Sequence, residues 1–324
     1  MIKLERKIIT SLPVAFILNK SKHWHVPGFE GVPVYDVLRF FYKQLKTVGL
    51  TERASAVAYN FIMAVPPSLL FLFTLVPNLP FIKKRDILKQ LTLIIKDIIP
   101  AEGYNRDIIR FIDKTFFGNA VYGILSFGLL FALYFASNAM MGIMRSFNKN
   151  YEGFAKRKWL HRRWIAIRLT VLIFGLVMGC LIVLITQGAV LKWLGMTSKF
   201  WIEFIYYIRW VIIVALIFYS IAFIYKYAPA VQKKWKLNSP GAILATFLCI
   251  LASLGFSYFV NNFGRYNALY GSIGTIMVLM ALIYINSLVL LIGFELNVSI
   301  KTLRAASINR DAIEKAHEAE QKTT

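Results

Sequence analysis

One carboxylate, Glu295, stands inside an otherwise apolar run that reads LLIGFELNVSI. An ionised carboxylate in such surroundings is costly, so it must be protonated, paired with a cation or turned toward a water-filled cavity. Lys226, Lys301 and Arg304 lie near the same end of the run and are candidate partners. Two roles remain open for Glu295: half of a structural ion pair, or a group that takes part in transport or gating.

Amide and tyrosine side chains also lie inside apolar runs, where polar groups usually face the interior of a helical bundle. They either line a binding cavity together with Glu295 or hydrogen-bond neighbouring helices, for about 0.5–2 kcal/mol each. The second role is the more common one for amides and tyrosines. The cavity candidates are Asn60, Asn138, Tyr219, Asn286, Glu295 and Asn297.

Sequence motifs for catalysis are missing, including the P-loop, the dinucleotide fingerprint, the nucleophile elbow and the His-Glu-x-x-His pattern. The four histidines are scattered along the chain, so their spacing assembles no metal site. His23 and His25 are one residue apart, and an exposed, solvated pair is favoured over a weak metal site. We therefore expect no catalytic residue, metal or cofactor, and no enzymatic activity.

The composition favours a membrane protein over a soluble one. Of the 324 residues, 58% are hydrophobic and 17% are charged, whereas a typical soluble domain is about 25% charged. Residues 168–191 hold no charged residue after Arg168, and a helix of that length facing water would need polar residues on one side. Cys180 and Cys249 also fall in apolar runs and are expected to be small core residues.

The predicted fold class is all-α: a polytopic transmembrane helical bundle with about six spans plus amphipathic interfacial helices. Pro66-Pro67 predicts a kink or break in the first span, because neighbouring helices and water can satisfy the freed carbonyls in a bundle. The last run is long enough that it should tilt or protrude. The runs cover residues 57–80, 119–143, 168–192, 208–227, 240–260 and 271–298.

The distribution of lysine and arginine predicts the orientation. Loops 144–167 and 228–239 are rich in cations, whereas 193–207 and 261–270 hold few, so the basic loops and both termini are expected in the cytoplasm. The 81–118 loop mixes cations with acids, and longer loops follow the rule less strictly. The net charge of +22 is accordingly ascribed to contact with anionic lipid head groups rather than nucleic acid.

Three domains are expected: a cytoplasmic N-terminal segment, 1–56; a six-span membrane domain, 57–298, with an extracytoplasmic helical loop at 81–118; and a cytoplasmic C-terminal tail, 299–324. Amphipathic helices are predicted at 34–48, with Gly49 as the stop, and at 86–99. Each lies flat on the bilayer or packs against the bundle, and both alternatives stay open. The polar tail after Asn309 is expected to be a frayed helix or disordered.

The loop before the last run combines glycines with hydrogen-bonding side chains. Because glycine permits tight turns, a re-entrant turn that seals the last two spans is favoured. The alternative is an outward gate, or a contact of the arginine with a phosphate head group. The residues of this outer-loop motif are Gly264, Arg265, Tyr266, Asn267, Tyr270 and Gly271.

The stretch 258–298, YFVNNFGRYNALYGSIGTIMVLMALIYINSLVLLIGFELNV, resembles the C-terminal signature of the YihY/BrkB family of bacterial inner-membrane proteins. The segments ASAVAYNFIMAVPPSLLFLF and YAPAVQKKWKLNSPGA extend the resemblance over roughly residues 40–305. The first span departs from the family pattern, since Pro66-Pro67 and Asn60 replace a single proline and a tyrosine. The matching residues of the signature are Gly264, Tyr266, Asn267, Tyr270, Gly271, Gly274, Gly293, Glu295 and Asn297.

The resemblance implies a multi-pass protein of the bacterial inner (plasma) membrane with both termini in the cytoplasm, and an association with virulence. The family has also carried the label ribonuclease BN. The sequence offers neither a carboxylate cluster for two metal ions nor an accessible histidine pair on a basic groove, so a nuclease is rejected.

The leading functional hypothesis is a transporter-like or lipid-handling protein with a polar cavity biased to the cytoplasmic half. The alternative is a non-transporting membrane scaffold for envelope-assembly partners. A cavity wide enough for a ligand favours the first, and a tightly packed bundle with an exposed apolar groove favours the second. The expected partners are membrane lipids or envelope proteins, with no nucleic acid, and the sequence does not indicate an oligomeric state.

Overall fold

The structure is a computed structural model that describes residues 24, 26–75, 121–148, 157–193, 199–231, 234–263 and 272–323. The described part of each predicted apolar run lies in a helix, which confirms the all-α class. The helices are α3 (Val34–Thr47), α4 (Leu50–Leu75), α7 (Val121–Phe147), α8 (Trp159–Trp193), α9 (Lys199–Tyr227), α10 (Pro240–Phe263) and α12 (Ser272–Thr323).

Four of these helices are long and apolar enough to cross a membrane within the described residues. The spans are Trp159–Cys180, Trp210–Tyr227, Pro240–Phe259 and Met277–Arg310. Only 17–33% of the most apolar window of each span is buried, so most of these side chains face outward, as lipid-facing side chains do. Helices α4 and α7, with 26 and 27 residues, carry the first two predicted runs.

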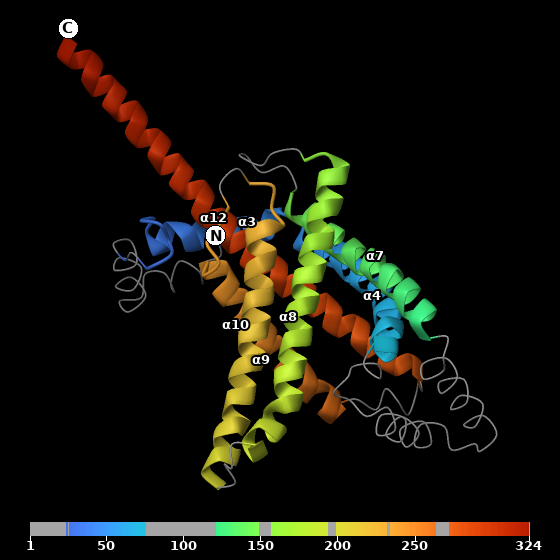
Figure 1. Cartoon of the computed structure of the whole chain (residues 1–324). Coiled ribbons are helices and arrows are strands. Elements are labelled where there is room, and N and C mark those ends of the chain that lie inside the picture. The colour runs from blue at the N-terminus through green and yellow to red at the C-terminus, as the bar shows by residue number, and fades with distance from the viewer. Residues whose placement is uncertain are drawn as a thin grey trace.

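Helix α12 runs through the assembly and contacts α10, α4 and α3 (Figure 1). Helices α4 and α7 lie side by side, and α8 contacts both α7 and α9. The C-terminal part of α12 extends away from the other helices as the red helix of Figure 1. The tail after Asn309, expected to be frayed or disordered, is therefore continuous helix as far as Thr323.

The predicted basic loops meet at one end of the bundle. We call it the basic end and define it by residues 145–148, 157–163, 228–231 and 234–239. There the Arg157 guanidinium donates to the Pro229 carbonyl at 2.7 Å, and the Asn148 side chain accepts the Ala230 N–H at 2.8 Å. These contacts join the end of α7 and the start of α8 to the loop that follows α9.

A cluster of aromatic rings also lies at the basic end, within the core of the bundle. The rings of Phe147 and Phe294 are stacked with centroids 3.9 Å apart, and both are fully buried. Trp235 lies against Phe294 at a centroid distance of 5.4 Å. Because α7, α12 and the α9–α10 loop each supply one of these rings, the cluster fixes how those three segments meet.

Two glycines let α10 and α12 approach closely. A Cβ atom added to Gly241 would lie 2.1 Å from the Gly293 carbonyl oxygen, and one added to Gly293 would lie 2.5 Å from the Gly241 carbonyl oxygen. Small residues at helix contacts allow backbones to pack in this way in membrane proteins. The Tyr225 hydroxyl donates to the Leu290 carbonyl at 2.5 Å and adds α9 to the same contact.

Helix α4 continues from Leu50 through both prolines to Leu75, so of the predicted kink or break at Pro66-Pro67 the break does not occur. A proline inside a helix removes one backbone hydrogen bond at a local cost of about 3 kcal/mol. Packing of α4 against α7 and α12 can offset that local cost.

The predicted amphipathic helix at 34–48 is confirmed as α3, and it ends before Gly49, whose φ is 63°. Val37 is fully buried and packs in a cluster with Leu296 and Ile300 of α12. Of the two alternatives left open for this helix, packing against the bundle is therefore realised. The predicted helix at 86–99, the 81–118 loop and the outer-loop motif from Gly264 to Gly271 lie outside the described residues.

Candidate functional site

The carboxylate of Glu295 is paired with the guanidinium of Arg53. The Arg53 Nη1 atom lies 2.6 Å from Glu295 Oε1, and the two side chains are 5% and 0% exposed. The Arg53 Nη2 atom donates to the Ser146 carbonyl at 2.5 Å. The pair thus joins α4, α7 and α12 at one buried point of the basic end.

The cations expected near Glu295 make other contacts. Lys301 and Arg304 pair with Glu30, and Lys226 lies over the ring of Tyr227. Arg53 was missed because the first apolar run begins after it, at residue 57, so that it fell in the predicted cytoplasmic segment 1–56. Its helical spacing carried the signal: Arg53, Val57 and Ala64 share one face of α4, and all three are buried.

The stability of the folded chain is not a sufficient reason for a buried ion pair. Removing two charges from water costs several kcal/mol per ion, and their attraction often only balances that cost. In membrane proteins such pairs commonly mark pathways or gates. The Arg53–Glu295 pair is therefore a candidate functional group as well as a tie between helices.

A cavity of about 760 Å³ lies beside the ion pair, between α4 and α7. The face of α4 that carries Ser55, Ala56 and Tyr59 is exposed, while the face that carries Arg53 is buried. Asn60 accepts from Arg145 Nη2 at 3.3 Å across the cavity. We call this space the α4–α7 cavity; its lining residues are Glu52, Arg53, Ser55, Ala56, Tyr59, Asn60, Gly142, Arg145 and Ser146.

The other predicted cavity residues make separate contacts. Asn138 accepts from Arg163 at 2.5 Å, and Asn297 accepts the Gly241 N–H at 2.9 Å, where it caps the start of α10. Asn286 donates to the Leu282 carbonyl of its own helix at 3.0 Å. Tyr219 is 46% exposed. Of the predicted residues, Asn60 thus lines the same cavity as Arg53 and Glu295 pairs with Arg53, whereas Asn138, Asn286 and Asn297 have partners elsewhere.

A second, more exposed group of charges surrounds Glu30, which precedes α3. Its carboxylate accepts from Lys301 Nζ and from Arg304 Nη1, the latter at 3.2 Å. Burial by itself raises the pKa of Glu30, but the hydrogen bonds and charges of Lys301 and Arg304 outweigh burial. The pKa of Glu30 therefore lies below its ordinary value of 4.5. Neither this contact nor Arg53–Glu295 could be read from local sequence.

Replacing Glu30 with Gln is expected to lower the melting temperature of the protein at neutral pH but not in acid. Because the folded pKa is depressed, the stability from Glu30 is present above pH 4.5 and falls as the pH drops through the folded value. Melting curves of wild type and Glu30→Gln between about pH 4 and 7 measure this difference. Asp36→Asn, an exposed carboxylate on α3, is the control. A difference that grows toward acid would contradict the ion pair.

Within the described ranges, no group of three or more His, Cys, Asp or Glu side chains could hold a metal ion. Cys180 is buried and Cys249 is half-buried, which confirms that both lie in the core. Both are free thiols. The chemistry that the described site offers is therefore ionic and hydrogen-bonding: two arginines and an amide beside one buried carboxylate.

Comparison with known proteins places these features in a family. The family described as "Virulence factor BrkB" matches residues 41–318. The chain is 30% identical over 249 residues, 76% of this chain and 88% of the relative, to YfkH of Bacillus subtilis (strain 168), which is named as ribonuclease-like. It is 25% identical to a UPF0761 membrane protein of Tolumonas auensis, over 79% of this chain and 82% of that one. No solved structure matches the chain.

Proposed function

The chain belongs to the BrkB virulence-factor family of integral membrane proteins, and on that premise we propose that it moves anionic lipids across the membrane through the α4–α7 cavity. The observation that carries the proposal is Arg53, which lines that cavity and is paired with the buried Glu295 behind it. Arg145 and Asn60 supply a cation and an amide on the same wall. A phosphate group is the ligand that such a set recognises.

The surroundings of the cavity suit an amphipathic molecule. Along the two helices from the cavity, Met63 on α4 and Phe131 on α7 are 51% and 47% exposed. An anionic head group would bind Arg145, while its acyl chains lie along these apolar side chains.

The ion pair would act as the gate. Because Arg53 lies on α4 and Glu295 on α12, separating them loosens the contact between these helices next to the cavity. A bound phosphate that competes with Glu295 for Arg53 would supply the differential interaction that such a change needs. By the positive-inside rule, we infer that the basic end and this cavity open toward the cytoplasm.

The proposal is tested by reconstituting the full chain into liposomes that carry fluorescent phosphatidylglycerol or phosphatidylcholine. We expect transfer of phosphatidylglycerol above empty vesicles, and about a tenfold lower rate for Arg145→Gln, because one charge-assisted hydrogen bond is lost. Arg145 is exposed, so the variant should fold.

Arg39→Gln, an equal loss of charge at an exposed position on α3, is the matched control and should transfer lipid at the wild-type rate. The proposal fails if no lipid moves faster than in empty vesicles. It also fails if the two arginine variants behave alike.

A further inference from the structure

A second cavity, of about 620 Å³, lies at the basic end away from the α4–α7 cavity, between the α9–α10 loop, α12 and the segment that holds Glu30. Among its lining residues, four are cations and only Glu30 is an acid. Its volume falls within the usual range of small-ligand sites, about 300–1,000 Å³. We call it the Glu30 cavity; its cations are Lys234, Lys236, Lys301 and Arg304.

Glu30 reaches these cations from a loop with an unusual backbone. Gly28, Glu30 and Gly31 have φ values of 99°, 53° and 85°, all in the left-handed region. That region is unfavourable for a glutamate, so surrounding contacts must hold it there. The loop also lies tightly on α10, since a Cβ atom on Gly28 would be 2.9 Å from Pro240 Cγ.

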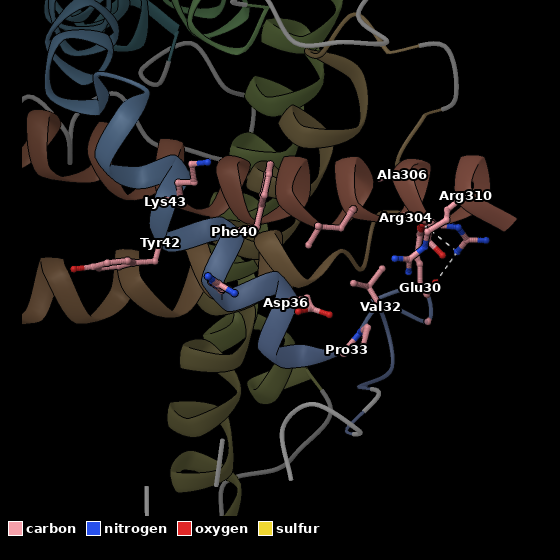
Figure 2. A pocket seen from close by; sticks show the side chains of 14 residues that line it. Glu30, Val32, Pro33, Asp36, Phe40, Tyr42, Lys43, Arg304, Ala306 and Arg310 are labelled. Carbon is pink, nitrogen blue, oxygen red and sulfur yellow. Dashed lines mark hydrogen bonds and ion pairs between the residues drawn. The ribbon is translucent and has the colours of Figure 1, made fainter. Parts of the chain in front are cut away.

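The Glu30 carboxylate fills the place of an anion between Lys301 and Arg304. Figure 2 shows it beside Arg304, with dashed lines to that guanidinium. The Lys301 and Arg304 side chains are 38% and 45% exposed and that of Glu30 is 20% exposed, so a solute can reach the cations. One carboxylate carries a single charge, which leaves the cavity with a surplus of cations.

Another cavity, of about 890 Å³, lies on the other side of the same loop, against α3, and is drawn in Figure 2. It shares Glu30 and Arg304 with the Glu30 cavity and is likewise lined by four cations, but it also contains a second carboxylate, that of Asp36. The additional acid makes the cavity against α3 less favourable for an anion than the Glu30 cavity. The charge balance therefore selects the Glu30 cavity.

We propose that the Glu30 cavity is a binding site for a phosphomonoester, which takes the place of the Glu30 carboxylate on Lys301 and Arg304. A phosphomonoester carries nearly two charges at neutral pH and offers three acceptor oxygens. Arginine and lysine donors favour such a group over a single carboxylate. Glu30 is then the internal occupant that leaves when the ligand binds.

Binding is measured by calorimetric titration of glycerol 3-phosphate into the full chain in detergent. We expect Lys301→Gln and Arg304→Gln to weaken binding about tenfold, because each removes a charge-assisted hydrogen bond. Glu30→Gln should strengthen it, by about fivefold or more, because it removes the competing carboxylate. A gain in affinity cannot arise from misfolding, so the Glu30→Gln result tests the proposal even if the other variants fold poorly.

Lys46→Gln, on the far end of α3, controls for the loss of one charge, and Arg39→Gln tests the neighbouring cavity. Competition by phosphatidic acid, but not phosphatidylcholine, in mixed micelles would identify a lipid head group as the source of the phosphate. Binding of glycerol 3-phosphate without such competition would identify a soluble ester. The proposal is overturned if neither phosphate binds, if Glu30→Gln does not bind more tightly, or if Arg39→Gln weakens binding as much as Lys301→Gln does.

Discussion

Replacing Glu295 with Gln is expected to lower the free energy of unfolding by about 3–5 kcal/mol, because the buried Arg53 guanidinium then lacks its counter-charge. The pair is 5% and 0% exposed, with 2.6 Å between Nη1 and Oε1. The neutral amide of glutamine cannot supply the lost counter-charge. Denaturation of the purified chain in mixed micelles, followed by circular dichroism, measures the loss.

The double variant Arg53→Met/Glu295→Leu separates a structural role from a functional one. Replacing both charges by apolar side chains of similar size is often neutral or stabilising, so this variant should recover most of the lost stability. Lipid transfer should nevertheless be lost in this double variant if the ion pair is the gate. Glu52→Gln, an exposed carboxylate on the same helix, is the control and should change stability by less than about 0.5 kcal/mol. Wild-type stability in Glu295→Gln alone would contradict the buried pair.

Gly293→Ala should also destabilise the chain strongly, by about 3 kcal/mol, a value near the upper end for overpacking. The added Cβ would meet the Gly241 carbonyl oxygen at 2.5 Å and the Tyr225 hydroxyl oxygen at 2.6 Å. The first of these is backbone, so relief requires α10 and α12 to move apart. Melting temperature in detergent is the measurement.

Gly255→Ala is the matched control for this prediction. Gly255 lies on α10 as Gly241 does, but no atom lies within 4 Å of its added Cβ. Alanine is the better helix former by about 1 kcal/mol, so this variant should be at least as stable as wild type. Equal melting temperatures for Gly293→Ala and Gly255→Ala would show that the close α10–α12 contact does not govern stability.

Much of the fold could be predicted from apolar run length and charge alone. The apolar runs fall in helices, and the 3.6-residue pattern located α3 to within a residue of its bounds. These signals are local, since each depends on residues within one helix. The continuous helix through Pro66 and Pro67 could not be predicted, because what compensates a proline lies on other helices.

The candidate site was predicted only in part for the same reason. Glu295 stood out because a carboxylate in an apolar run is costly wherever it lies. Its partner Arg53 is 242 residues away in sequence, and only the packing of α4 on α12 brings the two together. Asn60 lines the same cavity as Arg53, whereas Asn138, Asn286 and Asn297 have partners elsewhere.

The continuity of α12 ties the membrane-embedded and surface charges to one rigid body. Glu295 and Lys301 are six residues apart on this helix, which sets them about 9 Å apart along its axis and about 120° apart around it. Helix α4 and the loop that holds Glu30 therefore contact α12 on two different sides. A rotation of α12 about its own axis therefore changes the geometry of both salt bridges at once. A change at one salt bridge that rotates the helix also alters the other.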